Sequence, residues 1–259
     1  MLNLVLNENM KIYRRLRTWI MVGIMVVVAV IASFAYHNLT LADGSAEFWG
    51  AMVNLSMISF FIFIFTIIIA ADIVAGEFTW GTIKLLLIRP SSRSKVLLSK
   101  YISMLIFAVF LCIVLFVVLF LLNAILTGFD FSQESFAIPD SEHPFVYLLK
   151  YYGLTMLSLL MVATFAFMIS SAFRSSSLAI GLAMFIYFTG SIITAIFMRY
   201  SWSDYLIFKH LDLTMYLMDD TGGFADHMSL GFSLGVLAVY FVVFNIVSWV
   251  VFSKRDVAA

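Results

Sequence analysis

The sequence has little charge, few prolines and one cysteine. Only 12% of its 259 residues are Asp, Glu, Lys or Arg, and 63% are hydrophobic. Soluble domains contain about 25% charged and about 45–50% apolar residues, so the low charge excludes a water-soluble globule and predicts an integral membrane protein. Cys112 has no second cysteine with which to form an internal disulfide or a CxxC motif. The net charge is zero, so no basic field indicates a nucleic-acid partner.

Clear motifs of metal catalysis and nucleotide binding are missing. The sequence contains no HExxH zinc motif and no GxxxxGK[ST] phosphate loop. The GxSxG spacing occurs at Gly231–Gly235, but it opens the sixth apolar run, where small residues at this spacing are typical of helix packing. We therefore expect no catalytic residue and no cofactor site, and any ATP that the protein uses should bind to another chain. Histidines that could gather on zinc all fall outside the apolar runs, where such side chains are usually solvated, so we expect no metal site. They are His37, His143, His210 and His227.

Six apolar runs are long enough for transmembrane helices, which need about 20 residues each. Ser33-Phe34-Ala35 could end a cleavable signal peptide, but the preceding run exceeds the usual apolar core of about 7–15 residues, which favours a retained span. Lys100 could snorkel to the interface from the start of the third span. No expected span contains an ionisable residue of the kind used in ion pathways, which argues against a proton- or sodium-coupled carrier. The expected spans are 19–35, 49–71, 101–126, 151–173, 178–197 and 229–252.

Two further segments have apolar spacing typical of helices. Residues 1–17 predict an amphipathic helix on the membrane surface, although a frayed basic terminus is an alternative. Residues 198–228 place apolar side chains on one helical face, which predicts an interfacial or re-entrant helix sheltered by protein. Those side chains are Ile207, Leu211, Met215 and Met218.

The distribution of cations predicts the orientation. Of the fifteen Lys and Arg residues, twelve fall on one side of the six expected spans and three on the other. Because cytoplasmic loops are enriched in cations, both termini should be cytoplasmic, in a bacterial plasma membrane. The three outer cations are Lys150, Arg199 and Lys209.

Residues 76–95, GEFTWGTIKLLLIRPSSRSK, form a charged island on the cytoplasmic side. They predict a short helix from Thr82 to Ile88 that Thr79 or Thr82 caps and Pro90 ends. Leucines at 85–87 should contact membrane or protein. The residues alone leave two readings open, an interfacial connector and a docking surface for a soluble partner. The side chains expected to face water are Glu77, Lys84, Arg89 and Arg93.

The motif E-x-x-x-G-T-x-x-x-L-L-x-R-P-x-x-R in this island resembles ABC-2 type membrane subunits of ABC transporters. An FRSSS link between the fourth and fifth spans and a final VFSKRDV support the resemblance, which covers essentially the whole chain. It implies an all-α integral membrane protein with one ABC-2 transmembrane domain over 1–259. In that domain 1–17 would be an elbow helix, 76–95 a cytoplasmic coupling segment, and 198–228 an external re-entrant segment.

The resemblance further implies a permease subunit of an ATP-driven exporter. Its partners would be two copies of an ATP-binding subunit, which hold ATP and Mg, a second permease subunit that is identical or paralogous, and membrane lipid. Short outer loops resemble permeases of bacitracin and lantibiotic self-protection, which implies a hydrophobic or amphipathic cargo such as a peptide antibiotic or lipid. A regulatory or mechanotransmitting partner of an ATPase that moves no solute is the alternative. Coupling residues would be Glu77, Gly81, Thr82, Lys84, Leu85, Leu86, Arg89, Pro90 and Arg93.

Overall fold

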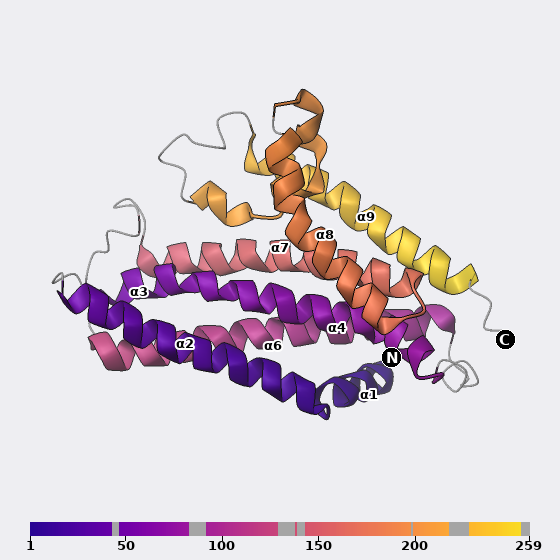
Figure 1. Ribbon diagram of the computed structural model, residues 1–259, viewed down its shortest axis with the longest axis horizontal. Helices are drawn as coiled ribbons and strands as arrows, with labels where there is room; N and C mark the ends of the chain where they lie inside the picture. The colour runs from indigo at the N-terminus through magenta and orange to yellow at the C-terminus, as the bar shows by residue number, and fades with distance from the viewer. Residues whose placement is uncertain are drawn as a thin grey trace. The chain divides into compact units, whose positions relative to one another are not determined.

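A computed structural model describes residues 1–42, 47–82, 92–128, 138, 143–197, 199–217 and 228–254, and the following statements concern these residues. Their regular structure is helical, with no strand in the described ranges (Figure 1). Six helical stretches are long and apolar enough to cross a membrane, which confirms the expected number of spans. They are α2 (Leu16–Ala42), α3 (Phe48–Leu55) with α4 (Ser59–Thr79), α6 (Arg93–Thr127), α7 (Pro144–Ala172), α8 (Ser176–Phe197) and α9 (Leu230–Lys254).

The helices extend beyond the apolar runs that predicted them. A short 3₁₀ turn, η1 (Ser56–Ile58), joins α3 to α4, and α4 continues eight residues past the expected end at 71. It therefore includes Asp72, which is 4% exposed and lies one residue beyond the expected span 49–71. Hydropathy marks the part of a helix that contacts hydrocarbon, whereas the backbone hydrogen bonds continue until a stop signal is reached.

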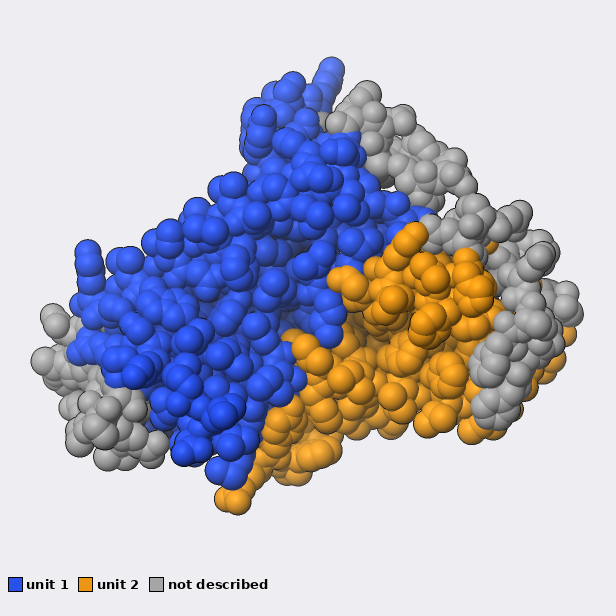
Figure 2. Space-filling view, turned by 180° about the vertical axis from the view of Figure 1, so that it is seen from behind, with its two compact units in different colours: residues 1–12, 63–107, 154–259 blue, residues 13–62, 108–153 orange. Residues whose placement is uncertain are grey.

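The chain divides into two compact units, which Figure 2 shows in different colours. Unit 1 comprises Met1–Ile12, Phe63–Phe107 and Leu154–Ala259, and unit 2 comprises Tyr13–Ile62 and Ala108–Gly153. In unit 2, the ring of Phe48 contacts Trp49 and Phe120 edge-on, with centroids 5.0 and 5.4 Å away. Aromatic edge-to-face contacts of this kind add to the area that the rings bury.

Small side chains form much of the core of unit 1. Because alanine lets helix backbones approach closely, α4, α6 and α7 can pack tightly without a large polar network. The end of α4 that contributes to this core is the end that leads into the 76–95 segment. The small buried residues are Ala70, Ala71 and Ala75 of α4, Ala163 and Ala166 of α7, and Ala179 and Ala183 of α8.

Residues 201–217 form three 3₁₀ helices: η2 (Ser201–Tyr205), η3 (Ile207–His210) and η4 (Leu213–Leu217). The expected single helix with a face at 207, 211, 215 and 218 is therefore wrong over the described residues, and Met218 lies outside them. Within η3 the buried side chains Ile207 and His210 lie three positions apart. A 3₁₀ helix has three residues per turn, so this spacing matches η3.

Candidate functional site

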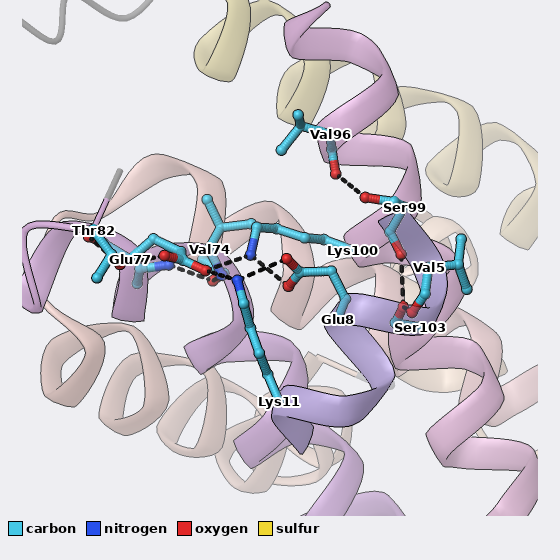
Figure 3. Close-up of polar contacts among 12 residues, drawn as sticks. Val5, Glu8, Lys11, Val74, Glu77, Thr82, Val96, Ser99, Lys100 and Ser103 are labelled. Atoms are coloured by element: carbon cyan, nitrogen blue, oxygen red, sulfur yellow. Dashed lines mark hydrogen bonds and ion pairs between the residues drawn. The ribbon is translucent and has the colours of Figure 1, made fainter. Parts of the chain in front are cut away.

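Four charged side chains meet at the start of the 76–95 segment (Figure 3). Glu8 and Lys11 come from α1 (Leu2–Tyr13), Glu77 from the last turn of α4 and Lys100 from α6. Nζ of Lys11 lies 2.8 Å from both Glu8 Oε1 and Glu77 Oε1. Nζ of Lys100 lies 2.7 Å from Glu8 Oε2 and 2.9 Å from Glu77 Oε1. Each carboxylate thus contacts both ammonium groups, and we call these four residues the charged cluster.

Most of the charged cluster is buried. The side chain of Lys100 is 1% exposed, and those of Glu8 and Glu77 are 7% and 11% exposed. Burying one such ion alone costs several kcal/mol, and a buried pair needs good geometry and further hydrogen bonds to offset this cost. The two acids and two bases balance one another, so the cluster encloses no net charge.

Lys11 is the most accessible member, with a side chain that is 38% exposed. Burial by itself lowers the pKa of Lys11, but its bonds to Glu77 and Glu8 act in the opposite direction and outweigh burial. The pKa of Lys11 is therefore raised above its ordinary value of 10.5. Lys11 therefore stays charged at any physiological pH. Its ion pair with Glu77, which joins α1 to α4, is kept over the same range.

Glu77 also holds the first residues of the 76–95 segment. The hydroxyl of Thr82 donates to the Glu77 carboxylate. Between them the chain leaves α4 through Gly81, whose φ of +68° lies in the left-handed region that favours glycine. The N–H of Gly81 donates to Phe78 O at 3.2 Å. One carboxylate therefore connects α1, α6 and the start of the segment.

α1 presents its charged face to the protein. Val5, Glu8 and Ile12 are its buried residues, and Ser103 Oγ of α6 donates to Val5 O at 3.2 Å. Its outward face is apolar, with Leu2 79% and Leu6 58% exposed. This polarity is that of an amphipathic helix, and the position on the membrane surface that the sequence predicts for residues 1–17 stays a prediction.

The structure changes the expected surroundings of several site residues. Glu77 was expected to face water and Lys100 to snorkel, but both lie in the charged cluster because they neutralise one another there. Arg93 was also expected to face water, and its Nη1 donates to Ser253 O, 2.9 Å away in the last turn of α9. Thr79 was a candidate cap for the short helix, but it belongs to α4 and donates to Ala75 O. Outside the described residues lie Ile83 to Ile88, and with them Lys84, Leu85 and Leu86, and also Arg89 and Pro90.

Sequence reasoning missed Glu8 and Lys11 as site residues. The available signal was position, because Glu8 lies at i+3 from Val5 and i−4 from Ile12, on the buried face of α1. An acid on a buried helical face implies a cation on a neighbouring element. Which cation it was could not be read from spacing, since Lys100 lies 92 positions away.

A second set of polar contacts, centred on His210, connects η3 to α9. Nε2 lies 2.8 Å from Asp204 O and Nδ1 lies 2.7 Å from Ser233 Oγ. Because a carbonyl only accepts, Nε2 carries the hydrogen, and Ser233 donates to Nδ1. Tyr216 OH lies 2.6 Å from the same Ser233 oxygen and donates to it. We call His210, Ser233 and Tyr216 the histidine relay.

Burial lowers the pKa of His210, which keeps the imidazole neutral. His210 has no exposed surface, so the expectation that the histidines are solvated is wrong for this residue. Within the described part of the chain, no three His, Cys, Asp or Glu side chains are grouped to hold a metal ion.

Comparisons with known proteins give a family and two relatives. Residues 18–258 match a family described as "Protein of unknown function (DUF2705)". "Uncharacterized protein YhcI" of Bacillus subtilis (strain 168) is 34% identical over 314 aligned positions, which cover 100% of both chains. "Uncharacterized membrane protein YdbK" of the same organism is 29% identical over 251 positions, 96% of this chain and 99% of the relative. The second name agrees with the six apolar helices, and together they indicate a multi-pass membrane protein.

Proposed function

Because the chain belongs to the family described as Protein of unknown function (DUF2705), we propose a function from its own residues. It is the membrane-spanning permease subunit of an ATP-driven exporter, and it does not hydrolyse ATP itself. The observation that carries this proposal is the place of Glu77. The 76–95 segment begins on a carboxylate that is bonded to α1 and to α6.

A buried ion-pair network is a stiff connection between the elements that it joins. Moving Glu77 out of the charged cluster leaves two ammonium groups against one carboxylate in a poorly solvated place, and this uncompensated charge costs about 3–5 kcal/mol. A displacement of the segment therefore moves the adjoining ends of α1, α4 and α6 together. Such rigid-body motion of packed helices is a common way to change access to a pathway.

The partner that supplies this displacement is a separate ATP-binding chain. The positive-inside bias supports a cytoplasmic position for the segment, where two copies of such a chain would dock on the assembled pair of permease subunits. ATP and Mg bind to those chains. The second permease subunit is a copy or a paralogue, and the cargo is a hydrophobic or amphipathic compound such as a peptide antibiotic or a lipid.

The test uses two glycines in matched backbone conformations. Gly81 and Gly128 both have positive φ, at +68° and +87°, and a Cβ added at either meets no atom within 4 Å. We expect Gly81→Trp to abolish co-purification of an ATP-binding chain that co-purifies with the wild type, or to reduce the ATP hydrolysis of that chain at least about tenfold. Gly128→Trp carries the same backbone strain away from the segment and should have neither effect.

Equal yield and equal ATP hydrolysis for the two variants would reject docking on this segment. ATP hydrolysis that responds to a peptide antibiotic while vesicles move no solute would instead support the mechanotransmitting alternative. In either case membrane insertion of both variants is checked first by their recovery in the membrane fraction.

A further inference from the structure

The turn between α7 and α8 lies beside the last turn of α4 (Figure 1). Ser176 N lies 2.9 Å from Thr79 Oγ1, and the Ser176 hydroxyl donates to the carboxylate of Asp72. These contacts belong to unit 1 and do not involve the charged cluster. The last turns of α4, which lead into the 76–95 segment, thus have a second set of polar contacts.

Thr79 completes the start of α8. The first N–H groups of a helix have no partner within the helix. Ser176 is the first residue of α8, and its N–H donates to Thr79, 97 positions earlier in the chain. Thr79 Oγ1 lies 3.1 Å from Ala75 O and 3.3 Å from Arg174 O, so its hydroxyl can donate to either oxygen. One side chain of α4 therefore contacts the link between α7 and α8 at Arg174 and the start of α8 at Ser176.

The chain itself supplies the other cap of α8. Ser175 Oγ accepts from the N–H of Leu178 at 3.4 Å, as an N-cap residue does. The local sequence is therefore sufficient for a helix to begin here. The contact with Thr79 adds something different, a fixed position of this helix start relative to α4.

Asp72 adds a favourable charge at the same place, because carboxylates are stabilised near helix N-termini. The Asp72 side chain lies close to Gly76, one turn later in α4. A Cβ on Gly76 would be 2.8 Å from Asp72 Oδ1. Glycine at position 76 therefore leaves the space that lets the carboxylate reach Ser176.

α7 is connected to the same part of α4. Ser170 Oγ accepts from Val74 N at 3.1 Å and from Ala75 N at 3.0 Å. The end of α4 is thus bonded to the helix before the turn and to the helix after it.

We propose that Asp72, Thr79 and Ser176 are positioning residues that make the α7–α8 turn move with the cytoplasmic end of α4. The purpose of this motion rests on the proposed function. The ATP-binding chain that displaces the 76–95 segment then acts on α8 through these three residues, as well as on α1 and α6 through the charged cluster.

The first experiment measures amide hydrogen exchange in the full chain in lipid nanodiscs, without any partner. Thr79→Val removes the acceptor for Ser176 N and should speed exchange in residues 173–178 about fivefold to tenfold, as expected for one lost hydrogen bond. Thr79→Ser keeps the hydroxyl and should exchange as the wild type does. Ser177→Ala is the neighbouring control for an exposed hydroxyl. Unchanged exchange in Thr79→Val would overturn the proposal.

The second experiment measures transmission in the complex with the ATP-binding chain. Adding ATP with vanadate should change exchange in residues 72–80 and in 176–182 of the wild type and of Thr79→Ser. In Thr79→Val the response of 176–182 should be clearly smaller than in the wild type, because only the contacts of Asp72 and Ser170 still join α4 to this turn. An equal response of 176–182 in Thr79→Val would count against the positioning role. If no ATP-binding chain forms a complex with the wild type, the proposed function fails, while the first experiment still decides the role of Thr79.

Discussion

The charged cluster and the histidine relay both lie in unit 1, and they stabilise it by different physics. The charged cluster joins three helices through four full charges, two of each sign, of which Glu8, Glu77 and Lys100 are largely buried. The histidine relay joins the 3₁₀ helices of residues 201–217 to α9 through neutral groups. Tyr216 donates to Ser233, and Ser233 donates to His210. Loss of one charge leaves an uncompensated ion, whereas loss of one neutral group leaves an unmet hydrogen bond. The charged cluster should therefore resist displacement of its helices more strongly than the histidine relay does.

Replacing Lys100 with Met should give the largest effect, a loss of about 3–5 kcal/mol in the free energy of unfolding, because two buried carboxylates then share Lys11 alone. Thermal unfolding in detergent checks it. Lys100→Met with Glu8→Gln leaves the Lys11–Glu77 pair balanced and should recover part of the loss. Lys209→Met breaks a pair whose Asp204 side chain is 39% exposed, so it should cost only about 0–1 kcal/mol. Equal losses for Lys100→Met and Lys209→Met would contradict the difference between buried and exposed charges.

Ser233→Ala should cost less, about 1–3 kcal/mol, because His210 Nδ1 loses its donor and Tyr216 loses its acceptor in a buried place. The same unfolding measurement applies. Ser191→Ala is the control, since that exposed hydroxyl donates to Phe188 O of its own helix at 3.1 Å. A loss for Ser233→Ala as large as that for Lys100→Met would remove the distinction between the two groups.

The smallest effect is expected from pH. Burial lowers the pKa of His210 from its ordinary 6.5, with Lys209 acting in the same direction and the backbone bond and charge of Asp204 opposing it. The unfolded segment binds a proton more readily than the folded one. The stability of residues 201–217 is therefore unaffected above a pH of about 6.5 and falls as pH decreases below that value.

Hydrogen exchange of residues 201–217, corrected for the intrinsic rate at each pH, measures this change. Exchange in the wild type should rise between about pH 7 and pH 5, whereas His210→Asn should show no such rise because it does not titrate. The charged cluster should be unchanged over the same range, since the raised pKa of Lys11 keeps that base charged. A parallel rise in His210→Asn would assign the effect to another group.

The six spans could be predicted from sequence because hydropathy over about 20 residues is a local property. The charged cluster could not, because its partners lie 66 and 92 positions apart and nothing local selects them. The 76–95 motif identified Glu77 as a site residue, but not its burial. Residues 201–217 were misread because their apolar spacing was tested against 3.6 residues per turn, while His210 takes a buried position at a period of three. His210 is buried but is not an apolar residue, so a search for apolar side chains alone does not reveal the three-residue spacing.

The neutrality of the charged cluster has an electrical consequence. Two acids and two bases that stay in contact carry no gating charge when the ends of α1, α4 and α6 shift together. An unpaired lysine that moved across the whole membrane would couple to the membrane potential by about 2.3 kcal/mol per 100 mV. The charged cluster moves without this coupling, so under the proposed function it adds no voltage dependence to transport.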